Sequence, residues 1–333
     1  MAFHNITGNS RVKKILKLAL RRQRVPNSLL FCGPEGVGKR TMALVLAKAL
    51  NCLQKTDDAC EECPNCKAIN KGAENREKGG FPDVMEIFPA TEVIKIEQMT
   101  EMKKLVYLKP MTGRKRIFII NEAEKMTEDA ANSHLKILEE PPLFSHIILI
   151  SSNSALLLPT IKSRCRPLNF LPVAREEIEQ ALRERGLEEE KARITALLVR
   201  GNIEQALELD WEDVQQKRQE AWNLFLAIVR REESSRFLER FSFERRRIVK
   251  EDLEQTLELF YSFCRDFVLL KERGDARLLF NPDYAARFGE NEKFFSRERA
   301  LRFLEFIEVA LANLDRNLNI GLIASSLYSQ AIG

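Results

Sequence analysis

Residues 33–41 read "GPEGVGKRT", and this stretch limits the possible folds of the chain more than any other. The apolar run "LLFC" (29–32) precedes it and the helical pattern "TMALVLAKAL" (41–50) follows it. A strand, a glycine-rich loop and a helix in this order are typical of a phosphate-binding loop, which aims backbone N–H groups and a helix N-terminus at a phosphate. The pattern therefore predicts an α/β fold with a parallel sheet.

The glycines and the lysine of this loop suit phosphate binding. We expect Gly33, Gly36 and Gly38 to let the backbone turn its N–H groups toward a phosphate. Lys39 is expected to reach the β- and γ-phosphates of a nucleotide. A glycine-rich turn that merely resembles a phosphate-binding loop is the alternative, but the flanking strand and helix argue against it.

The residue after the lysine departs from the motif. The pattern G-x-x-x-x-G-K-[ST] needs a hydroxyl there to bind Mg²⁺, but the residue is Arg40. An arginine offers no metal ligand and brings a fixed positive charge. Thr41 comes one residue late, and one step along a helix rotates a side chain by about 100°. The phosphate cradle is thus expected to survive without its magnesium ligand.

The second magnesium ligand of such proteins is an aspartate at the end of a buried strand. The candidate stretch is "RIFIINEAEKM" (116–126), where Asn121 and Glu122 follow the predicted strand. Asn121 has the shape of aspartate but lacks its charge. An ordinary strand end is the alternative reading of this stretch. Two absent magnesium ligands together argue against ATP hydrolysis by this chain.

Short apolar runs alternate with helical patterns through the first half of the chain. Several runs are rich in isoleucine and valine, which suits parallel strands buried on both faces. This alternation predicts a wound α/β domain. The predicted strands are 29–32, 84–88, 116–120, 147–151 and 167–171, and helices are predicted at 41–50 and 128–140.

From about residue 172 the strand-like runs disappear and the periodic patterns are helical. Gly186 and Gly201 are expected to end helices, and Ser296 to cap one. The predicted fold class is therefore α/β followed by all-α, and 333 residues suggest two or three domains. The helix after Ser296 is predicted from the spacing of Leu301, Leu304, Ile307, Leu311, Leu314 and Leu318.

Four of the seven cysteines lie close together in a polar stretch that includes "CEECPNC" (60–66). The spacing C-x7-C-x2-C-x2-C lets four thiolates surround Zn²⁺ tetrahedrally, and such a closed set predicts a structural site. Four buried cysteines without a metal are the alternative. The predicted zinc ligands are Cys52, Cys60, Cys63 and Cys66.

Charge and hydropathy exclude little else. A net charge of +4 is a weak indication of polyanion contact, and a free-standing DNA-binding module would more often be strongly basic. No apolar run approaches the roughly 18 residues of a membrane span. The N-terminal residues lack the apolar stretch of a signal peptide, so we expect a cytoplasmic protein with no membrane partner.

Three motifs in order carry a family resemblance. They are "GPEGVGKRT", "RIFIINEAEKMTEDAANSHLKILEEPP" (116–142) and "LLLPTIKSRC" (156–165). With them the chain resembles the AAA+ clamp-loader subunits of bacterial DNA polymerase III. The resemblance is specific over the first 170 residues and weaker beyond, where "NLNIGLIASSL" (317–327) is similar to the closing helix of the family.

This resemblance implies three domains. Residues 1–170 are expected to form a RecA-like AAA+ α/β domain with a zinc module at 52–66, as in the family. Residues 171–212 are expected to form a small helical lid. Residues 213–333 are expected to form a helical collar that joins a hetero-oligomeric ring with motor (gamma- or tau-like) and delta-like subunits. The ring loads a sliding clamp onto primer-template DNA.

Within the family, "SRC" (163–165) supplies an arginine finger. The resemblance implies that Arg164 reaches the γ-phosphate of ATP held by a neighbouring subunit, where a guanidinium stabilises the transferring phosphoryl group. A surface arginine in an ordinary salt bridge is the alternative. The motor subunits also carry a lid arginine that contacts the γ-phosphate, and the matching stretch "GNIEQAL" (201–207) puts Glu204 near that position.

Several basic residues lie near the end of the α/β region, and a solvated charged face explains them adequately. The resemblance places Lys136 on a helix beside the DNA chamber, so a phosphate contact is possible for it. The aromatic residues Phe260, Phe263, Phe267, Phe303 and Phe306 indicate helical core and subunit interface. The basic residues are Lys109, Arg114, Lys115, Arg116 and Lys136.

The sequence thus favours a supporting clamp-loader subunit with degenerate Walker motifs and an intact arginine finger. Such a chain has no ATPase activity of its own but is a component of a DNA-directed DNA polymerase holoenzyme. The main alternative is an active ATPase motor subunit of the same family that tolerates Arg40 and Asn121. Nucleotide binding without hydrolysis also stays open, because Lys39 and the loop glycines are present.

Overall fold

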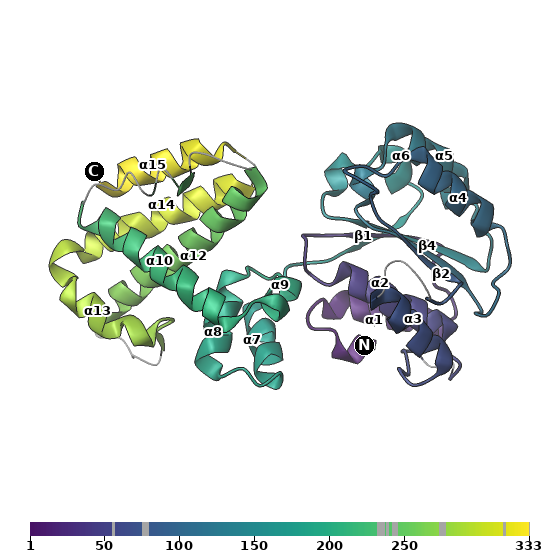
Figure 1. The fold of residues 1–333 in the computed structure, drawn as a ribbon, viewed down its shortest axis with the longest axis horizontal. Coiled ribbons are helices and arrows are strands. Elements are labelled where there is room, and N and C mark those ends of the chain that lie inside the picture. Colours follow the sequence, from purple (N-terminus) through teal and green to yellow (C-terminus); the bar gives the residue numbers. More distant parts are fainter. Residues whose placement is uncertain are drawn as a thin grey trace. The chain divides into compact units, whose positions relative to one another are not determined.

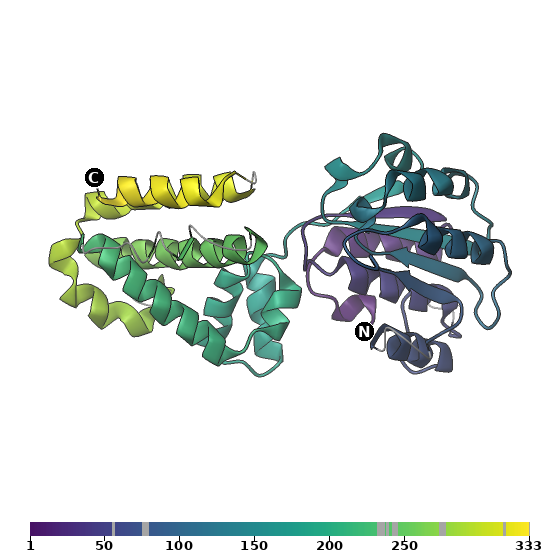
Figure 2. The same cartoon turned by 45° about the horizontal axis from the view of Figure 1, so that its top comes forward.

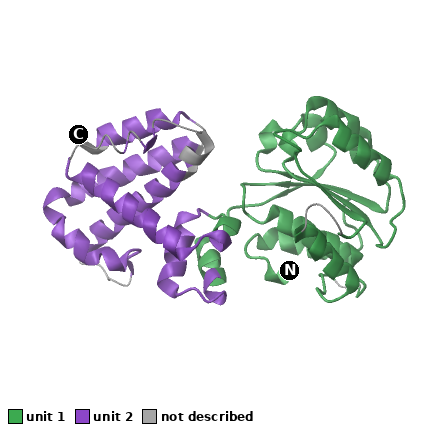
Figure 3. Cartoon of the chain, in the orientation of Figure 1, with its two compact units in different colours: residues 1–181, 201–205 green, residues 182–200, 206–333 purple. Residues whose placement is uncertain are grey.

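A computed structural model describes the chain at residues 1–54, 57–74, 80–231, 237, 240–241, 246–272, 278–315 and 318–332. The chain divides into two compact units (Figure 3). The first contains residues 1–181 and 201–205, and the second contains residues 182–200 and 206–333. The further division into a lid and a collar stays a prediction.

The first unit is built on a parallel sheet of five strands in the order β2-β3-β4-β1-β5. Strands β1 and β3–β4 are buried along their whole length, as expected of parallel strands covered by helices on both faces. The strands are β1 (Ser28–Cys32), β2 (Val84–Ile87), β3 (Arg116–Ile120), β4 (Ser145–Ser151) and β5 (Arg166–Asn169).

Helices cover both faces of this sheet (Figure 1). Alternate residues of β3 point to opposite faces: Ile117 and Ile119 pack with α1 and α2, whereas Phe118 and Ile120 pack with α4 and α5. The helices of this unit are α1 (Ser10–Arg21), α2 (Lys39–Asn51), α3 (Pro64–Glu74), α4 (Ile96–Val106), α5 (Glu128–Glu139) and α6 (Pro159–Lys162).

The predicted strands and helices of the first half are confirmed, with small shifts at their ends. Strand β4 begins at Ser145, two residues before the predicted start, because Ser145 and His146 still pair with β3. Helix α2 begins at Lys39 rather than at Thr41, because Gly38 forms its N-terminal cap. The α/β prediction for the first half is therefore confirmed.

The second unit is helical (Figure 2). Long helices α10 and α12 pack together and α12 packs along α14. Helices α7 (Arg175–Glu184) and α9 (Ile203–Glu208) contribute residues to both units. The remaining helices are α8 (Glu189–Leu198), α10 (Trp211–Val229), α12 (Arg246–Lys271), α13 (Ala285–Glu290), α14 (Arg297–Asp315) and α15 (Ile320–Ile332).

An aromatic core holds the second unit together. Trp222 lies at its centre, with ring centroids 5.1 Å from those of Phe263, Tyr284 and Phe288 in edge-on geometry. The prediction that the C-terminal phenylalanines form core is confirmed for Phe260, Phe263, Phe267 and Phe303, which are buried; Phe306 packs against this core partly buried.

The helix predicted after Ser296 is α14, and the Ser296 hydroxyl accepts a hydrogen bond from the Arg299 N–H at 3.2 Å. The predicted apolar series extends too far, because Leu318 lies beyond the end of α14 and is 51% exposed. Gly186 and Gly201 follow α7 and α8 with φ angles of 94° and 88°, as expected of helix-ending glycines. Within the described residues, no helix is both long and apolar enough to span a bilayer.

Candidate functional site

The glycine-rich loop follows the carboxyl end of β1, the edge of a parallel sheet at which ligands bind in such folds. Gly38 caps α2 with φ of 85°, a left-handed conformation that suits glycine. The register aligns Cys32 with Ser151 of β4, and the Gly33 N–H donates to the Ser151 carbonyl at 3.2 Å. The ends of β1 and β4 therefore meet at the loop.

Lys39 is buried, with 6% of its surface exposed. Its Nζ donates to the carbonyls of Gly33 and Pro34, the first of these at 2.6 Å. Burial lowers the pKa of Lys39, and the nearby carboxylates of Glu124 and Glu204 act in the opposite direction. In this structure the lysine expected to bind phosphate is thus held by its own loop and surrounded by negative charge.

Arg40 forms a two-point ion pair that the sequence did not reveal. Its Nε donates to Glu86 Oε2 at 2.7 Å and its Nη2 donates to Glu86 Oε1 at 2.7 Å. Nη2 also donates to the Ala73 carbonyl at 3.1 Å, and the guanidinium lies 5.6 Å from the Phe88 ring centroid. Glu86 is a carboxylate within the apolar run "VMEIF", and its side chain is only 13% exposed. A largely buried charge requires a partner, so the sequence indicated that Glu86 has one but not which residue it is.

Asn121 lies at the end of β3 and belongs to the same network. It is buried, and its side-chain amide donates to the Ile87 carbonyl at 3.4 Å and to Glu86 at 3.5 Å. The residues present do not fit a magnesium ion, because a guanidinium and an amide stand where the motif needs a hydroxyl and a carboxylate. Thr41 is half-buried on α2, one residue beyond the position of the motif hydroxyl.

The two glutamates after β3 differ in their surroundings. Glu122 has φ of 51° and pairs with Lys125, and its side chain is 42% exposed. Glu124 accepts hydrogen bonds from the backbone and the hydroxyl of Ser152 at the end of β4. Burial acts to raise the pKa of Glu124, but these hydrogen bonds hold it below its usual value. Sequence reasoning singled out Glu122 and missed Glu124, whose charge acts on Lys39.

The segment 201–205 packs onto the loop. The Glu204 N–H donates to the Gly36 carbonyl at 3.1 Å. A Cβ atom at Gly36 would lie 1.7 Å from Asn202 Oδ1, so only glycine fits under this segment. Asn202 Oδ1 in turn accepts a hydrogen bond from the Gln205 N–H at 2.9 Å and caps α9. The Glu204 backbone therefore lies beside the loop, and its match to the lid arginine of motor subunits stays a prediction.

Arg164 lies just after α6 and donates hydrogen bonds to α5, to α6 and to the Ser163 hydroxyl that follows α6. Its Nε donates to Glu139 Oε2 at 3.0 Å, and its Nη1 donates to the Thr160 carbonyl at 3.1 Å. The Arg164 and Glu139 side chains are 30% and 59% exposed, so the pair is solvent-accessible. Such exposed pairs are weak, and the guanidinium can exchange Glu139 for another anion.

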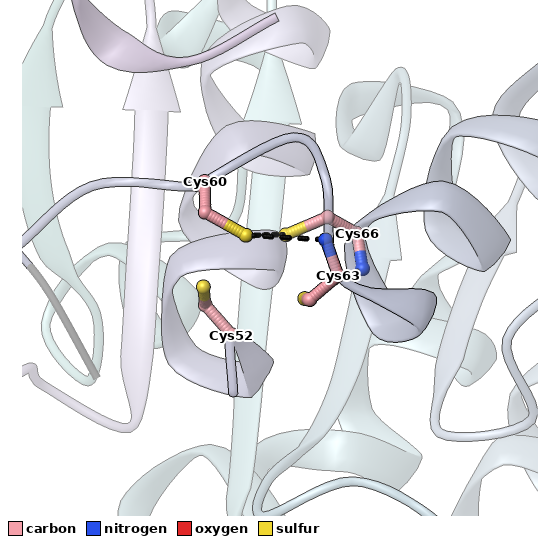
Figure 4. Close-up of side chains that lie close together, drawn as sticks. All are labelled: Cys52, Cys60, Cys63 and Cys66. Carbon is pink, nitrogen blue, oxygen red and sulfur yellow. Dashed lines mark hydrogen bonds between the residues drawn. The ribbon is translucent and has the colours of Figure 1, made fainter. Parts of the chain in front are cut away.

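The four clustered cysteines come together as predicted (Figure 4). Their sulfur atoms all lie within 4.8 Å of one another, and Cys60 Sγ lies 3.9 Å from Cys66 Sγ. A tetrahedral zinc site with Zn–S bonds of about 2.3 Å separates its sulfurs by about 3.8 Å. The four thiols therefore fit a zinc ion.

Backbone groups also favour the thiolate of Cys63, whereas burial raises the pKa of Cys52 and of Cys66. The Cys63 N–H donates to Cys60 Sγ at 3.3 Å and the Cys66 N–H donates to Cys63 Sγ at 3.5 Å. Although burial acts to raise it, hydrogen bonds from the backbone N–H groups of Leu53 and Cys66 lower the pKa of Cys63 to about 6. Thiolate is the form that binds metal. Residues 55–56 of the predicted module lie outside the described residues.

The basic residues near the end of the α/β region do not form one solvated face. Arg116 is buried, donates to Asp83 Oδ1 at 2.9 Å and is unavailable to DNA, which corrects the expectation for this residue. Lys109, Arg114 and Lys136 are exposed, as a solvated face requires. Any contact of Lys136 with DNA stays a prediction.

Comparison with known proteins identifies the family. The family model described as "DNA polymerase III, delta subunit" matches residues 8–174, half of the chain. The chain belongs to the DNA polymerase III delta subunit family. Membership agrees with the parallel sheet and phosphate-binding loop and establishes the predicted RecA-like AAA+ architecture within the clamp-loader family of DNA polymerase III.

Two curated relatives bear on the kind of subunit. The chain is 36% identical over 203 residues to DNA polymerase III subunit delta' of Bacillus subtilis, covering 61% of this chain and 59% of the relative. It is 34% identical over 181 residues to subunit tau/gamma of Haemophilus influenzae, covering 54% of this chain and 25% of the relative. The chain thus spans less than two thirds of the length of each.

Among solved structures, a DNA polymerase III gamma subunit-related protein of Thermotoga maritima aligns with 96% of this chain and 98% of its own length. The TM-score is 0.43 and the sequence identity is 17%.

Proposed function

We propose that this chain is a delta-prime-like subunit of a DNA polymerase III clamp loader. It supports the ring without hydrolysing ATP itself, and it supplies Arg164 in trans to the ATP site of a neighbouring motor subunit. The observation that carries the proposal is the ion pair of Arg40 with Glu86, formed at the position where a motor subunit needs a magnesium ligand.

The pair disfavours magnesium for an electrostatic reason. A divalent cation at this position would lie beside a fixed guanidinium, and Asn121 brings no negative charge to offset it. Moving Arg40 away would break two charge-assisted hydrogen bonds and leave Glu86, whose side chain is only 13% exposed, without its partner. The degenerate Walker motifs are thus part of a paired network rather than a simple loss.

Arg164 supports the role in trans. Its bonds to α5 and α6, together with its 30% exposure, leave a guanidinium at the surface that can meet the phosphate of another chain. A guanidinium supplied in this way stabilises the charge that develops during phosphoryl transfer, and its contribution to the rate is about 10³-fold or more.

The remaining assignments follow from the family. The proposed partners are motor and delta-like subunits of the ring, the sliding clamp, and primer-template DNA bound by the assembled complex. Residues 171–212 are proposed as the lid and residues 213–333 as the collar. Cys52, Cys60, Cys63 and Cys66 are proposed to hold a structural zinc ion, and the proposed location is the cytoplasm.

A motor subunit of the same family is the second candidate. The 34% identity to a tau/gamma subunit favours it, as do Lys39 and the loop glycines. This candidate requires ATP hydrolysis at a site that lacks both magnesium ligands. ATP hydrolysis by the isolated chain therefore distinguishes a motor subunit from a supporting subunit.

We expect the isolated chain to hydrolyse MgATP no faster than a buffer control, because Arg40 offers no metal ligand and Asn121 brings no negative charge to the site. Mixed with motor subunits, the sliding clamp and primed DNA, the same chain should enter the complex and raise its ATP turnover. Steady hydrolysis by the isolated chain, lost in Lys39→Ala, would instead identify a motor subunit. Failure to enter the complex would remove the proposed role altogether.

A further inference from the structure

The second unit contains a small pocket with an aromatic floor. It has a volume of about 220 Å³ and lies where the end of α10, the first half of α14 and the end of α15 meet. Phe295 and Phe303 are each 3% exposed, and Phe306 is partly buried beside them. Pockets that enclose small-molecule ligands usually measure about 300–1,000 Å³, so this one suits a single large side chain better.

Three arginines line the same pocket. Arg299 is fixed to its wall, because its guanidinium donates to the Val229 carbonyl at 2.8 Å and to the Phe294 carbonyl at 3.0 Å. Arg231 and Arg302 are exposed at the rim. Burial lowers the pKa of Arg299, and the positive charges of Arg231 and Arg302 lower it further. The three cations are therefore close enough to repel one another.

The pocket carries no negative charge of its own. Its lining residues, all within the described part of the chain, include no aspartate or glutamate. Glu298 lies one helical turn before Arg302 and interacts with it, but Glu298 is not part of the lining. Because three arginines and no carboxylate are among the lining residues, the pocket complements an anionic group beside an apolar one.

We propose that this pocket binds a protein segment in which one large apolar side chain is flanked by carboxylates. The apolar side chain fills the space above Phe303 and Phe306, and the carboxylates meet Arg231 and Arg302. An aromatic or aliphatic anchor in a pocket, bordered by charge pairs, is typical of the residues that dominate protein interfaces. The proposed segment belongs to another subunit of the ring, and in this respect the inference rests on the proposed function.

Charge reversal at the rim tests the proposal. The affinity of the full-length chain for a purified motor subunit is measured by surface plasmon resonance for the wild type, Arg231→Glu/Arg302→Glu, Arg302→Lys and Arg185→Glu. We expect at least a tenfold rise in Kd for the double variant. Arg302→Lys keeps the charge and should bind within about threefold of the wild type. Arg185 is exposed and distant from this pocket in sequence, so Arg185→Glu controls for a charge reversal elsewhere on the surface.

Two further measurements identify the occupant. A photoreactive benzoylphenylalanine in place of Gln330, which lines the pocket, should cross-link in the reconstituted complex to an acidic segment of the neighbouring subunit. Binding of a single-stranded oligodeoxynucleotide should be the same for the wild type and the double variant. Loss of oligonucleotide binding in that variant, with subunit binding retained, would assign the pocket to nucleic acid and overturn the proposal.

The outcomes separate the inference from the proposed function. A double variant that binds the motor subunit as tightly as the wild type overturns the inference and leaves the proposed function intact. A wild-type chain that binds no motor subunit overturns both. Thermal unfolding of the variants is measured alongside, and equal unfolding temperatures attribute a loss of affinity to the pocket rather than to the fold.

Discussion

At the scale of single residues, Arg40 replaces the metal-binding hydroxyl of the phosphate-binding motif with a cation. The loop before it has the form of a phosphate-binding loop, yet the side chain at the metal position forms two hydrogen bonds of 2.7 Å with a carboxylate on β2. The pair joins α2 to the edge of the sheet. It thereby fixes the start of α2 to β2.

Arg40→Ala tests this role through stability. The change removes the guanidinium that pairs with the Glu86 carboxylate. We therefore expect the free energy of unfolding of the first unit to fall by about 1–3 kcal/mol. Urea denaturation followed by circular dichroism measures the change. Arg11→Ala, at an exposed position on α1, serves as the control and should have a small effect. Equal stabilities for both variants would show that the pair contributes nothing.

Because His146 is buried, we expect the stability of the folded chain to depend on pH. His146 lies on β4, its Nδ1 donates to the Pro26 carbonyl at 3.1 Å, and burial is the main cause that lowers its pKa from 6.5 to about 4. Below pH 6.5 the unfolded chain takes up a proton that the folded chain accepts only near pH 4. Stability is therefore full above pH 6.5 and falls by up to about 3 kcal/mol as the pH drops to 4.

His146→Asn keeps a donor for the Pro26 carbonyl but removes the titrating group. Urea denaturation at pH 7, 5.5 and 4.5 should show a shallower loss of stability for this variant than for the wild type. His4→Asn, at an exposed position, should follow the wild-type curve. Identical slopes for all three proteins would contradict the assignment to His146.

Part of the candidate site was predictable because its signals are local. The loop glycines, Lys39, Arg40 and Asn121 each stand at a fixed place in a short motif. Glu86 and Asn202 were not predicted as partners of the loop, because Glu86 lies 46 residues from Arg40 in sequence and Asn202 reaches Gly36 only after the chain has folded. Contacts between distant segments depend on the tertiary fold, which no local pattern specifies.

At the scale of elements, the strands were the most predictable part of the fold. The isoleucine-rich runs of β3 and β4 are buried along their whole length, as their composition predicted. The strand ends were less predictable, since pairing with a neighbour decides where a strand begins. The division of the helical half was also less predictable, because helices α7 and α9 contribute to both compact units.

The cysteine module is joined to α2 by the buried, charged side chain of Lys48. The Lys48 amine is 2% exposed and donates to Glu61 Oε1 at 2.6 Å and to Asn70 Oδ1 at 2.8 Å, so α2 holds the turn that carries the cysteines. Metal binding at Cys60, Cys63 and Cys66 would add to this anchoring, because a structural zinc ion contributes folding free energy directly.

We expect the purified chain to contain about one zinc ion, measured by inductively coupled plasma mass spectrometry. Cys63→Ser should lose most of the metal and lower the unfolding temperature, because three thiolates bind zinc less tightly than four. Cys264→Ala removes a cysteine outside the cluster and should keep the metal. A wild-type chain without zinc, in which the four thiols react readily with a thiol reagent in the native state, would contradict this prediction.

At the scale of the whole molecule, the proposed role depends on assembly. An arginine finger and a collar have no function in an isolated chain, and the exposed Arg164–Glu139 pair is consistent with a group that changes partners when a neighbour binds. The proposed function therefore predicts a protein that is inactive alone and necessary in the complex. This pattern distinguishes it from a motor subunit, which is active at its own site.

Arg164→Ala in the reconstituted complex tests whether this subunit acts on the ATP site of its neighbour. DNA-stimulated ATP turnover is measured for complexes that contain the wild type, Arg164→Ala or Arg166→Ala, the last being an exposed arginine two residues away. Gel filtration should show equal assembly of all three. We predict that Arg164→Ala alone lowers turnover at the one adjoining site, so that the kcat of the complex falls while the Arg166→Ala complex matches the wild type. Equal ATP turnover by all three complexes would contradict a role for Arg164 at the ATP site of the neighbouring subunit.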